Sequence, residues 1–121
     1  MPKESFIKNR ILSVGYALKG AWLLVRTEAS IKIQVVIAML VTALGFYLDI
    51  SNIEWILQIF AISMVLGVEG VNTAIEKIAD FVQPEFDQKI GFIKDISAGA
   101  VMLVSIGATI IGLIIYIPKL F

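Results

Sequence analysis

Three long stretches of this chain contain no charged residue, and they restrict its possible folds more than any other feature. They cover residues 33–48, 55–68 and 96–118. Apolar and aromatic residues make up 59% of the chain, against about 45–50% in an average soluble domain. A transmembrane helix needs about 20 mostly apolar residues. The sequence therefore predicts an all-α membrane protein with a single domain, residues 1–121. The expected transmembrane helices cover about 30–48, 52–82 and 93–117.

The segment before the first span has the pattern of an amphipathic helix, with apolar residues on one face and polar residues on the other. The apolar face comprises Ile7, Ile11, Val14, Leu18, Trp22 and Val25. The polar face comprises Lys8, Asn9, Ser13, Lys19 and Arg26. We expect residues 1–28 to form a helix on the membrane surface. A cleaved signal peptide is not expected, because Lys8, Arg10 and Lys19 interrupt the apolar run.

The basic residues predict the orientation of the spans. Nine of the ten Lys and Arg residues precede or open the first span, or lie between the second and third. Because positive residues remain on the cytoplasmic side, we expect a cytoplasmic N-terminus and a cytoplasmic 77–94 region. Ser51 and Glu54 have the spacing of a capping box that begins the second span. Pro84 is expected to end that span.

The residue types that are absent exclude several kinds of chemistry. The chain has no Cys and no His, which excludes disulfides, thiol or imidazole catalysis and the usual zinc ligand sets. Ten basic and ten acidic residues cancel, so no net field favours nucleic acid as a partner. Any active chemistry must use carboxylates, amides, Lys and Arg.

A polar stripe runs along the end of the second span. Glu69, Asn72, Glu76 and Asp80 occur at i, i+3, i+7 and i+11, which places them on one face of a helix. If the helix starts near Ser51, Glu69 lies about 27 Å along it, near the inner edge of the hydrocarbon layer. Ionisable residues at membrane depth usually have a function. A purely structural polar seam between helices is the alternative.

The stripe and its expected neighbours suit a hard metal ion and a phosphorylated substrate. Glu28 precedes the first span at the same expected depth as Glu76, and Lys94 and Asp95 open the third span at that level. Mg²⁺ commonly binds one or two carboxylates together with substrate phosphates. Metal-assisted phosphoryl transfer, which depends on positioning and charge stabilisation, is therefore the predicted chemistry. Alternatively, Glu28 could only stabilise a helix dipole.

Four motifs carry a resemblance that covers essentially the whole chain. They are G-Y-A-L-K-G at 15–20, Glu28, E-G-V-N-T-A-I-E at 69–76 and K-D-I-S-A-G-A-V at 94–101. With them the chain resembles the small integral-membrane prokaryotic diacylglycerol kinase family, which includes undecaprenol kinases. The resemblance implies a homotrimer in the bacterial inner membrane, with active sites between subunits on the cytoplasmic side. It also implies transfer of the γ-phosphate of MgATP to a lipid hydroxyl, and the chain contains no P-loop motif.

The resemblance also implies a role for each matching residue. Glu69 would be the general base, and Glu28 and Glu76 would bind the metal ions. The residues that would contact the nucleotide are Tyr16, Glu28, Asn72, Glu76, Glu85, Asp87, Lys94 and Asp95. A ligand-binding arginine of the family falls at Asn9 here, with Arg10 next to it, and Gln34 replaces an acid of the lipid slot.

The sequence leaves alternatives for the acceptor lipid and for the class of function. We expect diacylglycerol as the acceptor, giving phosphatidic acid, with undecaprenol, giving undecaprenyl phosphate, as the alternative. The I-E-W at 53–55 and the I-P-K at 117–119 are more similar to the undecaprenol-using branch. A proton-coupled transporter would place its carboxylate near the bilayer midplane, so the position of the stripe favours a kinase. A scaffold whose stripe specifies helix assembly is the third alternative.

Overall fold

A computed structural model describes residues 5–121, and in this range the chain forms four α-helices. They are α1 (Phe6–Thr27), α2 (Ala29–Tyr47), α3 (Asn52–Val82) and α4 (Gln88–Leu120). The last three are long and apolar enough to cross a membrane, which confirms the three predicted spans. The helix predicted within 1–28 is also present, although residues 1–4 lie outside the described residues. Its location on a membrane surface stays a prediction.

Side chains next to the helix ends explain where α3 and α4 begin. Ser51 Oγ accepts a hydrogen bond from the Glu54 amide at 3.2 Å, and Glu54 Oε1 accepts one from the Ser51 amide at 2.9 Å. The predicted capping box is therefore present. Asp87 Oδ1 accepts hydrogen bonds from the amides of Lys89 and Ile90. With this N-cap, α4 begins at Gln88, before the predicted start at 93, and it also continues to Leu120, beyond the predicted end at 117.

A tight turn joins α2 to α3. Asp49 adopts a φ of 52°, which Asp tolerates better than most residues other than Gly. Gly45 lies against Trp55, and a Cβ atom at Gly45 would approach the Trp55 ring to 2.8 Å. Only glycine fits at this position without displacing the ring, so the close approach of α2 to α3 depends on it.

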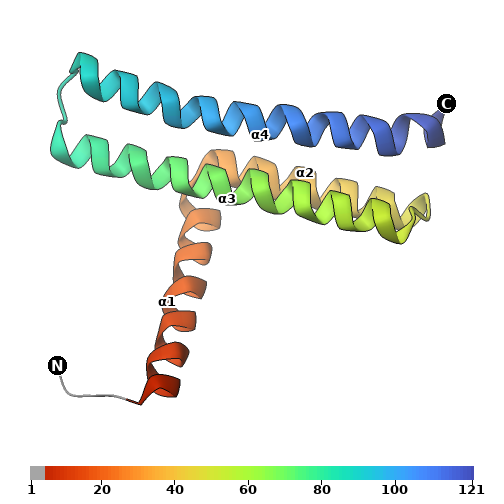
Figure 1. Ribbon diagram of the computed structural model, residues 1–121, viewed down its shortest axis with the longest axis horizontal. Helices are drawn as coiled ribbons and strands as arrows, with labels where there is room; N and C mark the ends of the chain where they lie inside the picture. The colour runs from red at the N-terminus through yellow and green to blue at the C-terminus, as the bar shows by residue number, and fades with distance from the viewer. Residues whose placement is uncertain (1–4) are drawn as a thin grey trace.

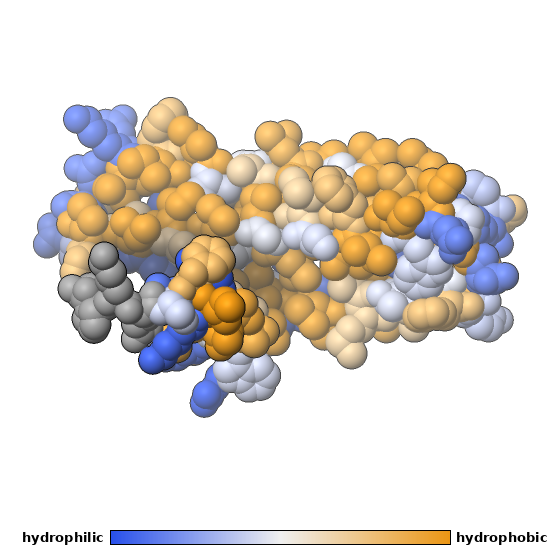
Figure 2. Space-filling model, turned by 60° about the horizontal axis from the view of Figure 1, so that its bottom comes forward, coloured by the Kyte–Doolittle hydropathy of each residue, from blue (hydrophilic) through white to orange (hydrophobic). Residues whose placement is uncertain are grey.

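The three predicted spans lie alongside one another, whereas α1 extends away from them at a large angle (Figure 1). None of the residues of α1 is buried. Hydrophobic side chains cover the middle of the bundle, and hydrophilic side chains gather at its two ends (Figure 2). This distribution is that of a multi-pass membrane protein.

Polar side chains tie the three spans together at the end where α3 begins, which we call the clamp end. The Tyr116 hydroxyl lies 3.0 Å from the Val41 carbonyl and within hydrogen-bond distance of Gln58 Oε1. Gln58 Nε2 also donates to the Val41 carbonyl, at 3.3 Å. Lys119 Nζ lies 2.9 Å from Glu54 Oε2. Tyr116, Gln58 and Val41, from three helices, therefore form one hydrogen-bonded cluster at this end, and the Lys119–Glu54 pair adds a second link between α3 and α4.

Tyr116→Phe tests the contribution of the clamp end to stability. We expect the free energy of unfolding to fall by about 0.5–1.5 kcal/mol, because the variant loses a partly buried hydrogen bond. The measurement is unfolding in mixed micelles. The matched control is Tyr47→Phe, which alters an exposed tyrosine at the same end and should leave the stability unchanged. Equal stabilities of the two variants would contradict this account.

Candidate active site

The polar stripe on α3 passes gradually from buried to exposed. Glu69 and Asn72 are buried, with 8% and 7% of their surface exposed. Glu76, one turn further along, is half-buried, and Asp80 is exposed. The predicted common face therefore exists, and it leads from the interior of the bundle toward the α3–α4 connection. We call this end of the bundle the carboxylate end.

The Glu69 carboxylate lies between α2 and α3 and has few partners. Gln34 Nε2, from α2, donates to Glu69 Oε2 at 3.4 Å. The Thr73 hydroxyl donates to the Glu69 backbone carbonyl at 3.1 Å and not to its carboxylate. Among residues 5–121, no ion pair includes Glu69. A buried carboxylate with one long hydrogen bond retains most of its capacity to accept a proton or a hydrogen bond.

Two buried carbonyl oxygens, one in the stripe and one beside it, have no hydrogen-bond partner within the described chain. They are Gln34 Oε1 and Asn72 Oδ1. The amide nitrogens of the same two residues are occupied, because Gln34 donates to Glu69 and Asn72 donates to Glu76 Oε1 at 3.3 Å. Buried polar atoms are rarely left unpaired in proteins. These oxygens are therefore suited to a ligand hydroxyl, a water molecule or a cation.

Glu28 lies at the junction of α1 and α2, and its place beside Glu76 stays a prediction. It ends α1 and begins α2, but its side chain makes no capping hydrogen bond. Instead, Glu28 Oε1 lies 3.7 Å from Nζ of Lys77, the residue after Glu76 on α3. This contact links the start of α2 to α3 at the carboxylate end.

The remaining predicted residues differ in how closely they approach the stripe. Lys94 forms an ion pair with Asp80, the exposed member of the stripe. Asp87 begins α4 as its N-cap. Glu85 and Asp95 are exposed. Tyr16 has 72% of its surface exposed on α1, so its place near a nucleotide stays a prediction.

The oxygen atoms at the carboxylate end fit a hard cation. No three carboxylates within residues 5–121 converge closely enough to hold a metal ion by themselves. Mg²⁺, however, often takes only one or two carboxylates and fills its other positions with water and phosphate oxygens. Glu76 supplies one carboxylate, and the amide of Asn72, whose Oδ1 is unpartnered, donates to it. Glu28, which contacts the neighbouring Lys77, is the candidate for a second carboxylate.

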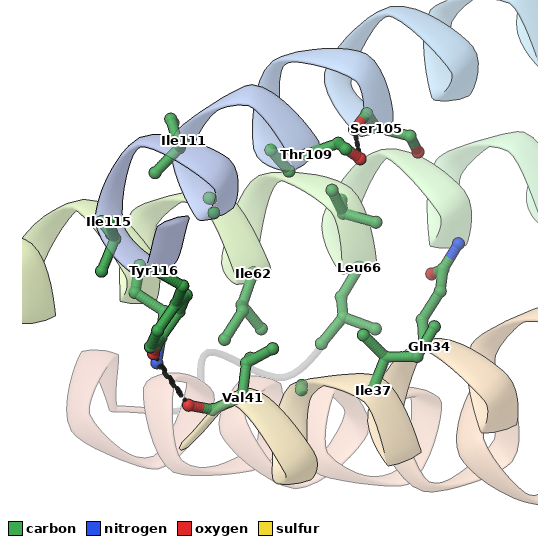
Figure 3. Close-up of a pocket in the computed structure, with 16 residues that line it drawn as sticks. Gln34, Ile37, Val41, Ile62, Leu66, Ser105, Thr109, Ile111, Ile115 and Tyr116 are labelled. Atoms are coloured by element: carbon green, nitrogen blue, oxygen red, sulfur yellow. Dashed lines mark hydrogen bonds between the residues drawn. The ribbon is translucent and has the colours of Figure 1, made fainter. Parts of the chain in front are cut away.

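An apolar groove runs between α2, α3 and α4, and the sequence analysis did not find it. Its volume is about 300 Å³, and Gln34 lies at one end, with Tyr116 at the other (Figure 3). Its lining is mostly apolar, with Ile62 and Leu66 of α3 between the two ends. Two amide residues within otherwise apolar stretches, Gln34 and Gln58, were the sequence feature that could have indicated this groove. Gln34 donates a hydrogen bond to Glu69, so this end of the groove is linked to the stripe through Gln34.

Comparison with known proteins identifies the family of the chain. The family model described as prokaryotic diacylglycerol kinase matches residues 15–116. The chain belongs to this family. This confirms the resemblance carried by the four motifs and makes the chain an ATP-dependent lipid kinase by class. The family lends no support to a proton-coupled transporter.

Curated relatives of this kinase family carry two different names. The undecaprenol kinase of Bacillus subtilis (strain 168) is 34% identical over 105 residues, which cover 87% of this chain and 85% of that protein. The diacylglycerol kinase of Escherichia coli (strain K12) is 32% identical over 103 residues, covering 83% and 82% of the two chains. The diacylglycerol kinase of Haemophilus influenzae is 27% identical over 103 residues, covering 85% and 87%.

Proposed function

We propose that this chain transfers the γ-phosphate of ATP to the primary hydroxyl of diacylglycerol, giving phosphatidic acid. The observation that carries the proposal is the hydrogen bond from Gln34, at one end of the apolar groove, to Glu69, the buried first member of the polar stripe. A lipid hydroxyl approaches Glu69 from the apolar side, along the groove. A nucleotide approaches from the aqueous side, at Glu76 and Lys94. The two substrates differ in polarity, and this junction is accessible to both.

Glu69 is proposed as the general base. Its carboxylate has one long hydrogen bond, so an oxygen is available to accept the hydroxyl proton as the oxygen–phosphorus bond forms. The Gln34 Nε2 donor fixes the orientation of the carboxylate. The unpartnered Gln34 Oε1 can accept a hydrogen bond from the lipid headgroup and hold it beside Glu69.

Glu28 and Glu76 are proposed as the residues that hold Mg²⁺. The ion would neutralise charge on the phosphates of ATP. Asn72 is proposed to orient Glu76, because its amide donates to Glu76 Oε1, and its carbonyl oxygen has no partner in the described chain. Lys94 can leave Asp80 and bind a phosphate instead, because breaking an exposed ion pair loses little free energy. Tyr16, Glu85, Asp87 and Asp95 are proposed to contact the nucleotide, as the resemblance implies.

Undecaprenol is the second candidate acceptor. The observation that favours it is the 34% identity to the undecaprenol kinase of Bacillus subtilis. Undecaprenol and diacylglycerol both present a primary hydroxyl to the site and differ in the hydrocarbon behind it. The same Glu69 chemistry would serve either lipid.

The proposed assembly is a homotrimer in the bacterial inner membrane, with its N-terminus and active sites on the cytoplasmic side. The distribution of Lys and Arg supports this orientation, because nine of ten lie at the carboxylate end or in the segments leading to it. The proposal that a neighbouring subunit completes each site rests on the family resemblance. The helix α1 is proposed to lie on the membrane surface, as its two-faced pattern indicates.

The choice of acceptor tests the proposed function. Purified protein in lipid bicelles would receive γ-labelled MgATP with diacylglycerol, with undecaprenol or with no added acceptor. We expect a labelled lipid, with diacylglycerol as the better acceptor. Faster labelling of undecaprenol would establish the second candidate instead. Absence of a labelled product with both lipids, from protein whose helical circular dichroism is intact, would contradict the kinase.

Glu28→Gln and Glu76→Gln test the metal-binding residues. We expect each variant to raise the Mg²⁺ concentration for half-maximal phosphate transfer by about tenfold or more, because each removes a charged oxygen ligand. The measurement is a Mg²⁺ titration at saturating ATP. Asp49→Asn is the matched control: it removes a carboxylate at the opposite end of the bundle and keeps a residue that tolerates positive φ. An unchanged Mg²⁺ requirement in Glu76→Gln would refute the assignment.

A further inference from the structure

A second lysine, Lys77, lies among the acids of the carboxylate end. It follows Glu76 on α3, and its Nζ atom lies 3.7 Å from Oε1 of Glu28. Glu28 stands where α1 joins α2 (Figure 1). Glu28 and Glu76 are the two acids proposed to hold Mg²⁺. Lys77 therefore adjoins one of these acids in the sequence and contacts the other in space.

The ion pair between Lys77 and Glu28 is loose. Its separation of 3.7 Å is longer than a charge-assisted hydrogen bond, which spans about 2.7–2.9 Å. The side chain of Lys77 is 73% exposed, whereas that of Glu28 is 26% exposed. Breaking an exposed ion pair loses little free energy, and a lysine ammonium is carried on a flexible four-carbon stem. The acid is thus the fixed partner, and the ammonium is the mobile one.

A nucleotide that binds at the carboxylate end adds negative charge to a group of acids. The acids are Glu28, Glu69, Glu76 and Asp80, and the cations paired with members of this group within residues 5–121 are Lys77 and Lys94. Phosphate oxygens and carboxylates repel one another at close range. Mg²⁺ offsets part of this charge, and a lysine ammonium is itself a common phosphate-binding group. The charge balance therefore favours lysines that can leave their carboxylates and bind phosphate.

We propose that Lys77 is a second phosphate-binding lysine, which Glu28 holds in the free protein and releases when Mg²⁺ binds. The proposal rests on the proposed kinase function, because the phosphates are those of MgATP. Lys77 and Mg²⁺ compete for the same carboxylate, so the ammonium is free once the metal is bound. It then donates hydrogen bonds to phosphate oxygens and reduces their repulsion from the acids. Lys77 thus makes the binding of metal and of nucleotide favour each other.

Lys77→Gln tests this exchange by binding measurements alone. The variant and the unsubstituted chain, both in nanodiscs, would be titrated calorimetrically with Mg²⁺ alone and then, at saturating Mg²⁺, with a non-hydrolysable ATP analogue. We expect the affinity for the nucleotide to fall by about tenfold, which corresponds to one hydrogen bond to a charged group. The affinity for Mg²⁺ alone should be equal or higher, because Glu28 has lost a competing cation.

Lys77→Arg and Lys89→Gln are the matched controls. Lys77→Arg keeps a cation at the position and should retain the nucleotide affinity. Lys89→Gln removes another exposed cation, in the first turn of α4, and should change neither affinity. A purely structural ion pair would instead lower the affinities for Mg²⁺ and nucleotide together. Such a parallel loss, or an unchanged nucleotide affinity in Lys77→Gln, would overturn the proposal.

Glu28→Gln in the absence of metal tests the release of Lys77. Binding of labelled ATP would be measured by equilibrium dialysis with EDTA present. We expect Glu28→Gln to raise the affinity for metal-free ATP, because Lys77 loses the acid that holds it. In the Lys77→Gln background the same substitution should give a gain about two- to fivefold smaller, the range expected for an exposed ion pair. An equal gain in both backgrounds would contradict the release of Lys77.

The same measurements separate the role of Lys77 from the kinase function. Phosphate transfer by the unsubstituted chain, together with an unchanged nucleotide affinity in Lys77→Gln, would overturn the role of Lys77 and leave the kinase function intact. Absence of nucleotide binding by the unsubstituted chain, with and without Mg²⁺, would refute both.

Discussion

A carboxylate at the edge of a hydrocarbon layer is costly unless protein or water faces it, and the arrangement of α3 follows from this constraint. Glu69 faces Gln34 of α2, whereas Glu76 and Asp80 become progressively more exposed toward the α3–α4 connection. The stripe therefore changes from a buried, weakly hydrogen-bonded acid to solvated acids within three helical turns. This gradient supports a division between proton transfer at the buried position and binding of charged groups at the exposed positions.

The two ends of the bundle differ in how fully their polar groups are paired. At the clamp end, Tyr116, Gln58 and Val41 form a connected cluster, and Lys119 pairs with Glu54. At the carboxylate end, two buried carbonyl oxygens remain without partners in the described chain. Such paired networks favour a fixed packing of helices. The unpaired oxygens, by contrast, provide hydrogen-bonding capacity that a ligand can use.

Features set by local sequence could be predicted, and features set by helix packing could not. The spans follow from length and apolar composition, the capping box from a three-residue spacing, and the stripe from helical periodicity. The contacts of Glu28 with Lys77 and of Lys94 with Asp80 depend on how each helix is rotated against its neighbour. The groove depends on side-chain volumes from three helices together. The early start of α4 depends on Asp87, which lies outside the apolar segment that marked the span.

The central claim is that Glu69 performs the chemistry at the junction of the groove and the stripe, and Glu69→Gln tests it most directly. The measurement compares the phosphate-transfer rate with MgATP affinity from isothermal titration. Glu54→Gln, which alters an acid at the other end of α3, is the control. The account predicts that Glu69→Gln lowers the rate by about 10²–10⁴-fold with MgATP affinity unchanged, while Glu54→Gln retains activity. A near-normal rate in Glu69→Gln would contradict it.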